Sequence, residues 1–248
     1  MHTNAPCKYA LKSHRTSMKK IGFISVPDNT KAILWDMDGV LIDSLGLDLT
    51  VTNELLNIYF GEKVILSREY ITSIFGYTIP EFWGRIFKKI ETELGIQSSE
   101  ELCGRIVDEY TAHRLKSTFS ILPGVERALA DAKKSGIQNA VVSNNPVVQI
   151  QEILSKAGII KNFDLVVGND SVSGLKNKPE PDMYVYALKQ LKIGPEDGVV
   201  VEDSLIGVEA GKRAGCSVIA IATGGSTTSG FENMRSFRPD NIYQSLSK

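Results

Sequence analysis

The sequence predicts an α/β fold, a doubly wound parallel sheet of the Rossmann-like kind with a second, all-helical unit inserted into it. Short apolar runs that are typical of buried strands alternate with segments of helical periodicity, and this order favours strand–helix–strand crossovers. Strands of a parallel sheet are covered on both faces, so they are apolar without alternation. One long stretch breaks this order with helices alone, and it predicts the insert.

The predicted strands are five apolar runs, and each ends at a polar residue or a glycine. They cover residues 32–35, 139–142, 163–167, 199–201 and 217–222. The helices between them are predicted from apolar residues at helical spacing, with glycine or proline near several of their ends. They cover residues 124–135, 146–158, 182–191 and 205–214.

The domain organisation follows from where the alternation stops. Helical periodicity runs almost without interruption from residue 45 to residue 120, so we expect a helical insert there, and a sheet domain formed by residues 31–44 and 121–248. Residues 1–30 carry several lysines and no acid before Asp28, and we expect a disordered N-terminal extension. An organellar transit peptide is the alternative for this segment.

Composition excludes several classes of partner. The formal net charge of -1 leaves no basic excess to hold nucleic acid or an anionic membrane, so we expect neither. No apolar run approaches the roughly 20 residues that span a bilayer. The three cysteines, Cys7, Cys103 and Cys216, show neither metal-binding nor disulfide spacing, which favours a reducing, cytoplasmic location. The oligomeric state is not indicated.

Polar side chains gather after the predicted strands, where open parallel sheets bind their ligands. Several carboxylates brought together repel one another and require a cation, and oxygen ligands without histidine or cysteine suit Mg²⁺. The cation and a lysine would attract a phosphate group, and one carboxylate could then attack phosphorus. The side chains concerned are Asp36 and Asp38, Ser143 and Asn144, Lys178, and Glu202 and Asp203.

Four motifs carry a family resemblance. They are DMDGVLIDS at 36–44, VVSN at 141–144, KPEPD at 178–182 and VEDS at 201–204. In this order and spacing, over about residues 31–224, they resemble the haloacid dehalogenase-like hydrolase superfamily. The helical insert stands where that family has its first type of cap, and we call residues 45–120 the cap.

The resemblance implies a role for each catalytic side chain. Asp36 resembles the nucleophile that forms a phosphoaspartate, and Asp38 the general acid that protonates the leaving oxygen and later deprotonates water. Ser143, the Asn144 amide and Lys178 resemble the group that holds the phosphate oxygens.

A Mg²⁺ site is implied in the same way. Its expected ligands are Asp36, the backbone carbonyl of Asp38, and Asp203, with Glu202 as the second acid of the fourth motif. Mg²⁺ is therefore the expected cofactor, and a small phosphorylated metabolite the expected substrate.

The branch of the family is indicated by single residues. Asp38 argues against the dehalogenases and the phosphonate-cleaving members, because the resemblance implies that both lack this second acid. Sugar-phosphate mutases of the β-phosphoglucomutase type carry a hinge histidine and a cap lysine, where this chain has Asp48 and Phe75. We therefore expect a phosphatase, a phosphoric monoester hydrolase acting on a sugar phosphate or a phosphoglycolate-like ester. A mutase and a non-catalytic binding protein remain alternatives.

Substrate specificity is expected to come from the cap. Gly76 marks a loop that could face the strand ends, so we expect Tyr77, Trp83 or Arg85 to contact the substrate.

Overall fold

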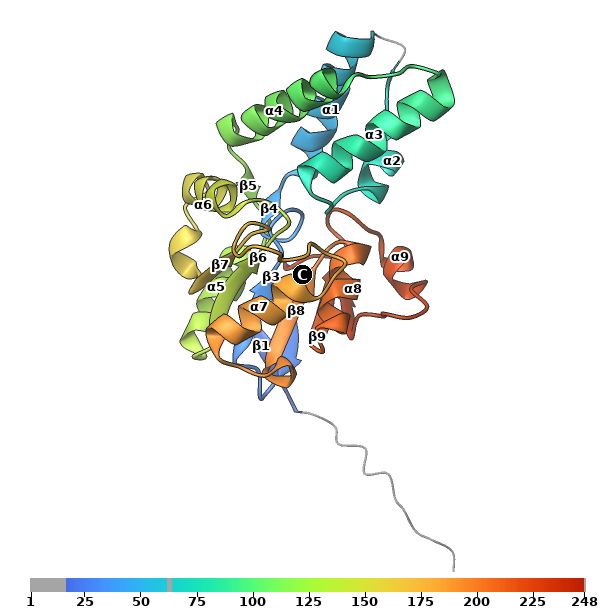
Figure 1. The fold of residues 1–248 in the computed structure, drawn as a ribbon. Coiled ribbons are helices and arrows are strands. Elements are labelled where there is room, and N and C mark those ends of the chain that lie inside the picture. The colour runs from blue at the N-terminus through green and yellow to red at the C-terminus, as the bar shows by residue number, and fades with distance from the viewer. Residues whose placement is uncertain (1–16, 62–63, 248) are drawn as a thin grey trace, which may run out of the picture.

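The computed structural model describes residues 17–61 and 64–247 (Figure 1). Its centre is a parallel sheet of six strands in the order β10-β9-β8-β3-β6-β7, which confirms the predicted α/β class. The strands are β3 (Ala32–Trp35), β6 (Gln138–Val142), β7 (Leu165–Val167), β8 (Gly198–Glu202), β9 (Ser217–Ile221) and β10 (Asn241–Tyr243). The edge strand β10 was not predicted, because its three half-buried residues form no apolar run.

Helices cover both faces of the sheet. They are α5 (Val125–Lys134), α6 (Val147–Lys156), α7 (Asp182–Leu191), α8 (Leu205–Arg213) and the short α9 (Thr228–Glu232). Ile33 and Trp35 of β3 pack with α5 and α6, while Leu34 packs on the opposite face with α7 and α8. The central strand is therefore buried at every position. This explains its continuous apolar sequence.

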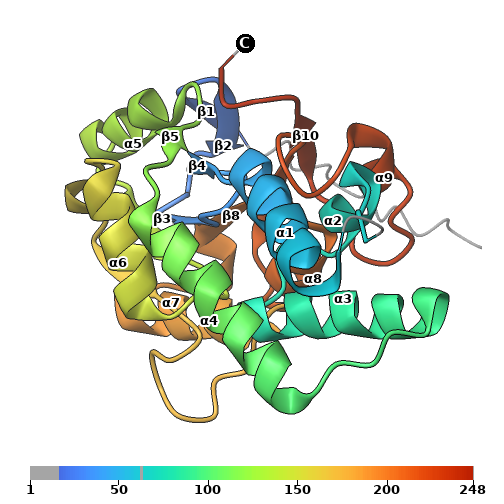
Figure 2. The ribbon, with the colours of Figure 1, turned by 90° about the horizontal axis from the view of Figure 1, so that it is seen from above.

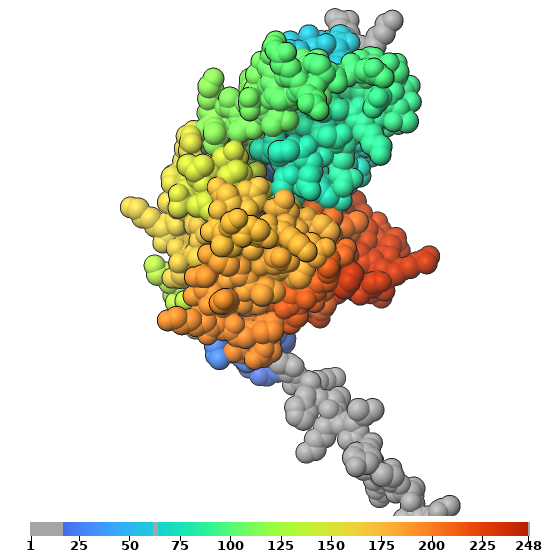
Figure 3. Space-filling model, viewed as in Figure 1, coloured from blue at the N-terminus to red at the C-terminus, as the bar shows by residue number. Residues whose placement is uncertain are grey.

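In the described part of the cap, four helices lie above the carboxyl ends of the strands, as Figures 1 and 2 show for their placement. These are α1 (Leu45–Phe60), α2 (Arg68–Ser73), α3 (Ile79–Leu94) and α4 (Glu100–Lys116). Short antiparallel strands β4 (Ile42–Asp43) and β5 (Ser120–Ile121) pair where the chain leaves and re-enters the sheet domain. The helices enclose an apolar core of their own. In the space-filling view the cap rests directly on the sheet domain (Figure 3).

The helix α3 shows how sequence sets one of these elements. Thr78 and Glu81 form a reciprocal capping box, which satisfies backbone N–H groups at the first turn. Gly95 ends the helix in the left-handed region with φ of 67°. Between these ends Trp83 and Ile86 lie on the face that the cap core buries.

The N-terminal segment corrects one expectation. Strands β1 (Met18–Ile21) and β2 (Ile24–Pro27) form a hairpin, so a disordered extension reaching residue 30 is wrong for residues 17–30. Ile21, Ile24 and Val26 are fully buried in the core cluster that includes α5, and this burial orders the hairpin. Residues 1–16 lie outside the described part of the chain. Within the described part, no helix is both long enough and apolar enough to cross a membrane.

Candidate active site

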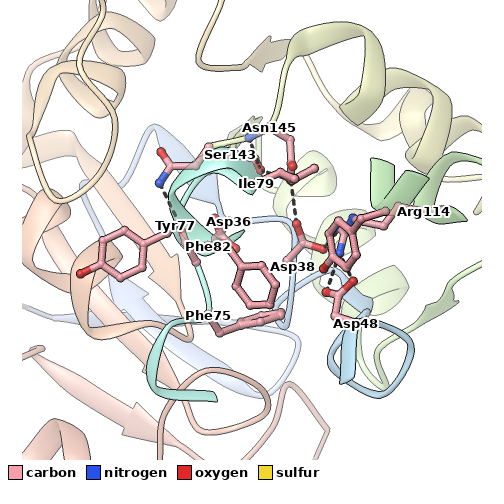
Figure 4. Close-up of a pocket in the computed structure, with 13 residues that line it drawn as sticks. Asp36, Asp38, Asp48, Phe75, Tyr77, Ile79, Phe82, Arg114, Ser143 and Asn145 are labelled. Atoms are coloured by element: carbon pink, nitrogen blue, oxygen red, sulfur yellow. Dashed lines mark hydrogen bonds and ion pairs between the residues drawn. The ribbon is translucent and has the colours of Figure 1, made fainter. Parts of the chain in front are cut away.

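A small cavity of about 40 Å³ lies where the cap meets the carboxyl ends of the strands (Figure 4). The sheet domain contributes a wall that follows β3 and β6, formed by Asp36, Asp38, Ser143, Asn144 and Asn145. The cap contributes the opposite wall from three of its helices and the loop before α3, chiefly Asp48, Phe75, Tyr77, Ile79, Phe82 and Arg114. Polar groups from distant parts of the sequence thus meet at one enclosed point.

Asp36 belongs to a buried group of acids beside this cavity. Its backbone N–H donates to the Val201 carbonyl at 2.9 Å, which continues the β3–β8 ladder and fixes the residue at the strand end. The carboxylates of Asp36, Glu202 and Asp203 offer oxygen atoms that all lie within 4.8 Å of one another. The Lys178 Nζ atom donates to Asp36 Oδ1 at 2.5 Å and to Glu202 Oε1 at 2.6 Å. Three carboxylates thus face one ammonium group.

The electrostatics of this group favour the binding of a cation. Burial, followed by the charge of Glu202, raises the pKa of Asp36 well above its ordinary value, although Lys178 opposes the shift. Burial and the charge of Asp36 likewise raise the pKa of Asp203 well above its ordinary value. A divalent cation would relieve this repulsion, and an all-oxygen donor set is the kind that Mg²⁺ takes.

The backbone around Asp203 leaves its carboxylate very little room. A Cβ at Gly39 would meet Asp203 Oδ2 at 2.1 Å, and one at Gly224 would meet it at 2.3 Å. The Gly225 N–H donates to the same oxygen at 2.6 Å. Because glycines allow two loops to close around one carboxylate, Asp203 is held in a fixed position, which suits a metal ligand.

Glu202 is bound on both oxygens by groups of the protein. Oε1 accepts from Lys178 and, at 2.8 Å, from the Tyr184 hydroxyl, while Oε2 accepts from the Ser204 hydroxyl at 3.0 Å. These contacts make Glu202 the residue that holds Lys178 beside Asp36. Its role as a metal ligand stays a prediction. The sequence did not indicate Tyr184, which lies in the first turn of α7, directly after the KPEPD motif.

Asp38 lies apart from the acid group and contacts the cap. Its Oδ1 accepts from Arg114 Nη2 at 2.5 Å, and its Oδ2 accepts from Asn145 Nδ2 at 2.8 Å (Figure 4). Arg114 also binds both oxygens of Asp48 through Nη1, at 2.5 Å for Oδ2. Burial raises the pKa of Asp48, and the Arg114 charge opposes that shift. Asp38 is therefore held by one donor from each domain.

Arg114 and Asn145 were not identified as site residues from the sequence. Arg114 follows Ile106 and Tyr110 at intervals of four residues, on the buried face of α4. A charged side chain that continues an apolar stripe is a usable signal, because a buried charge requires a partner. Asn145 is simply the next polar residue after the predicted pair Ser143 and Asn144.

The loop after β6 brings together the residues that are predicted to bind phosphate. The Ser143 hydroxyl is buried and accepts from the Asn145 backbone N–H at 3.2 Å. The Asn144 side chain is engaged by backbone groups, because its Nδ2 donates to the Gly76 carbonyl at 2.8 Å and its Oδ1 accepts from Lys178 N–H at 3.0 Å. Asn144 thus connects the cap loop to the residue that carries the lysine.

The three expected specificity residues are placed differently from one another. Tyr77 lines the cavity, and Arg85 lies outside it with its guanidinium 3.8 Å from the centre of the Tyr77 ring. Trp83 is fully buried in the cap core, packed against Phe87 and Tyr110, and it does not line the cavity, so nothing in this arrangement supports the expected contact with substrate. Its position on the apolar face of α3 turns it away from the cavity.

Comparison with known proteins identifies relatives of this arrangement. A model of the family described as haloacid dehalogenase-like hydrolase matches residues 33–221. A phosphorylated carbohydrates phosphatase of Thermotoga maritima is 32% identical over 185 residues, which cover 75% of this chain and 82% of that protein. A bifunctional riboflavin kinase/FMN phosphatase of Arabidopsis thaliana is 34% identical over 195 residues, which cover 77% of this chain. The chain spans about half, 48%, of the length of that relative.

A solved structure extends the comparison to the fold. CbbY from Rhodobacter sphaeroides, crystallised with phosphate, superposes with a TM-score of 0.69 at 26% sequence identity. The match covers 88% of this chain and 96% of that one, so it includes the cap as well as the sheet domain.

Proposed function

The chain belongs to the haloacid dehalogenase-like hydrolase family and is a phosphoric monoester hydrolase, and from that premise we propose that it is a Mg²⁺-dependent phosphatase of small phosphorylated metabolites. The observation that carries the proposal is the pairing of Asp36 with Lys178 inside the buried acid group, beside a cavity that Asp38 also lines. We assign the attack on phosphorus to Asp36 and the proton transfer to Asp38.

In the first step an Asp36 carboxylate oxygen forms a bond to phosphorus as the bond to the leaving oxygen breaks. Lys178 holds the other Asp36 oxygen and neutralises phosphate charge, and the Ser143 hydroxyl donates to a phosphate oxygen. Because the Asn144 side chain is engaged elsewhere, we assign its backbone N–H to the phosphate. Asp38 gives its proton to the leaving oxygen.

In the second step Asp38 takes a proton from water, and the water oxygen attacks the phosphoaspartate. The bond between phosphorus and Asp36 breaks, so phosphate leaves and the carboxylate is restored. Mg²⁺, which Asp36, Asp203 and the Asp38 carbonyl would hold, supplies charge neutralisation between the incoming phosphate and the buried acids when bound.

The substrate that we propose is a sugar phosphate or a phosphoglycolate-like ester. The cavity is small and lies between the cap and the sheet domain, so we expect the cap to open to admit substrate and to close on it. The phosphorylated carbohydrates phosphatase among the relatives supports a sugar phosphate.

The test is phosphate release across a panel of sugar phosphates, phosphoglycolate and polyol phosphates, with Mg²⁺ and with a chelator. Asp36→Asn, which keeps the shape of the side chain, is the control. Metal-dependent release that the variant loses supports the proposal. Isomerisation of a hexose phosphate without phosphate release would instead identify a mutase.

A further inference from the structure

We propose that Arg114 is a positioning residue of the reaction, which aims the Asp38 carboxyl group at the leaving oxygen of the substrate. The inference rests on the proposed phosphatase function and adds a residue from the cap to it. It starts from the shortest connection between the two domains at the cavity, the contact of 2.5 Å from Arg114 Nη2 to Asp38 Oδ1.

The Asp38 carboxylate is fixed in direction by donors on two sides. Arg114 holds Oδ1 from the cap, and Asn145 holds Oδ2 from the sheet domain. A carboxylate with one donor can turn about its terminal bond, whereas donors on both oxygens define one orientation. For the proton transfer, Asp38 must be protonated on one oxygen, and the O–H on that oxygen points to the leaving oxygen while the donor on the other oxygen keeps the orientation.

Arg114 is itself fixed, which a positioning role requires. Only 5% of the residue is exposed, and both oxygens of the equally buried Asp48 accept from its Nη1 atom. The guanidinium carbon lies 5.3 Å from the centre of the Phe119 ring. Asp48 therefore anchors Arg114 in the cap through Nη1, and the Nη2 atom of the guanidinium group reaches Asp38.

Charge argues that Arg114 acts on Asp38 and does not receive an anionic group of the substrate. Two acidic side chains, Asp38 and Asp48, already occupy N–H groups of this one guanidinium, which leaves it poorly placed to receive a further anion. The cap wall beside it is formed by Phe75, Ile79 and Phe82, which are apolar. An arginine that recognised a substrate carboxylate would be expected to have N–H groups free of acidic partners.

Because Arg114 comes from the cap, it can align Asp38 only while the cap is closed. Proton donation to the leaving oxygen is then tied to closure, and an open cap leaves Asp38 with Asn145 alone. This gives the cap a part in the chemistry in addition to excluding water.

The test compares esters that differ in their need for a proton. Alkyl phosphates require protonation of the leaving oxygen, whereas p-nitrophenyl phosphate expels a stable anion without it. The quantity measured is kcat/KM, which reports the phosphoryl transfer to Asp36. For Arg114→Met we expect kcat/KM on the alkyl ester to fall about 10- to 100-fold further than on p-nitrophenyl phosphate, the lower part of the range for general acid catalysis. Asp38→Asn should show the same selectivity to a larger degree.

Controls separate this role from folding. Arg105→Met removes an exposed arginine from the same helix α4, and it should leave both esters unchanged. The double variant Arg114→Met with Asp48→Asn leaves no unpaired charge in the cap, and its thermal unfolding shows whether the cap is intact. In this variant the selective loss should persist.

Two results would overturn the inference. An equal loss on both esters in a folded double variant means a structural role only. A rise in KM confined to carboxylate-bearing substrates means that Arg114 binds substrate. If the wild-type protein releases phosphate from no ester, the proposed function itself fails, which is a distinct result.

Discussion

The two walls of the cavity differ in how their charges are satisfied. On the sheet-domain wall, Asp36, Glu202 and Asp203 face the single ammonium of Lys178, and burial raises the pKa of Asp36 and Asp203. On the cap wall, both oxygens of Asp48 are bound by Arg114, and most of the remaining lining is aromatic or aliphatic. On our proposal, one wall is completed by a cation from outside the chain, whereas the other is neutralised by Arg114.

This difference separates two tasks. An acid group that lacks positive charge can attract a metal ion and hold a phosphate with it, which every substrate of the enzyme requires. A wall whose charges are neutralised within the cap, and which is otherwise largely apolar, can orient the substrate and distinguish one substrate from another without binding the phosphate group. Changes to the sheet-domain wall should therefore affect all substrates, and changes to the cap wall should affect some more than others.

The largest effect is expected for Lys178→Met. Removal of the ammonium group that contacts Asp36 and Glu202 leaves buried charges unpaired, which should cost about 3–5 kcal/mol of unfolding free energy. Phosphate release should fall at least about 10³-fold on alkyl and aryl esters alike. Lys176→Met, on the same loop but exposed, is the matched control and should behave as wild type. A loss restricted to alkyl esters would contradict the division between the walls.

The next effect concerns metal binding and can be measured without turnover. Mg²⁺ at 100 times its dissociation constant should stabilise the native protein by about 2.7 kcal/mol, seen as a higher Tm in thermal unfolding. Asp203→Asn should abolish most of this gain, because it removes a predicted ligand. Asp48→Asn should retain it. If both variants lost the gain to the same extent, the acid group would not be the metal site.

A smaller effect is expected for Asn145→Ala on the sheet-domain side of Asp38. The variant removes the donor to Asp38 Oδ2 but leaves Arg114 in place. We expect kcat/KM on alkyl phosphates to fall about 10-fold, with less change for p-nitrophenyl phosphate. Combined with Arg114→Met, the loss should differ from the product of the two single losses, because both donors act on one carboxylate.

The smallest effect tests the apolar part of the cap wall. Ile79→Val removes one methylene group beside the cavity, so the ratio of kcat/KM between a small and a larger ester should change, by up to about 10-fold. Trp83→Phe lies behind this wall in the cap core and should lower stability while leaving the ratio unchanged. A change of ratio in Trp83→Phe alone would contradict the placement of the two residues.

The sheet domain was largely predictable because its signals are local. Each of these buried strands carries a short apolar run, and Asp36, Ser143 and Asp203 follow their strands directly. The parallel order of those strands then brings the polar residues to one edge. The hairpin of β1 and β2 was missed, because Ile21, Ile24 and Val26 are apolar only at intervals within a basic segment.

The cap side of the site was less predictable, because its contacts depend on how helices pack. The four cap helices were recognised, yet the sequence does not give the rotation of each about its axis. Trp83 was therefore placed toward the substrate and Arg114 was overlooked. The pair of Arg114 with Asp48 joins residues 66 positions apart, for which periodicity on either helix offers no direct sign.

The hairpin of β1 and β2 has a practical consequence for handling the protein. It covers the end of the sheet where β3 begins, which is opposite the cap (Figure 1). A fluorophore or an immobilising linker attached at Ser17 would thus lie on the side of the sheet domain opposite the cap. The cavity would then face away from the support. The same geometry argues against removing the hairpin. A truncated form that began at Lys31 would expose the apolar face of α5 and should aggregate in solution.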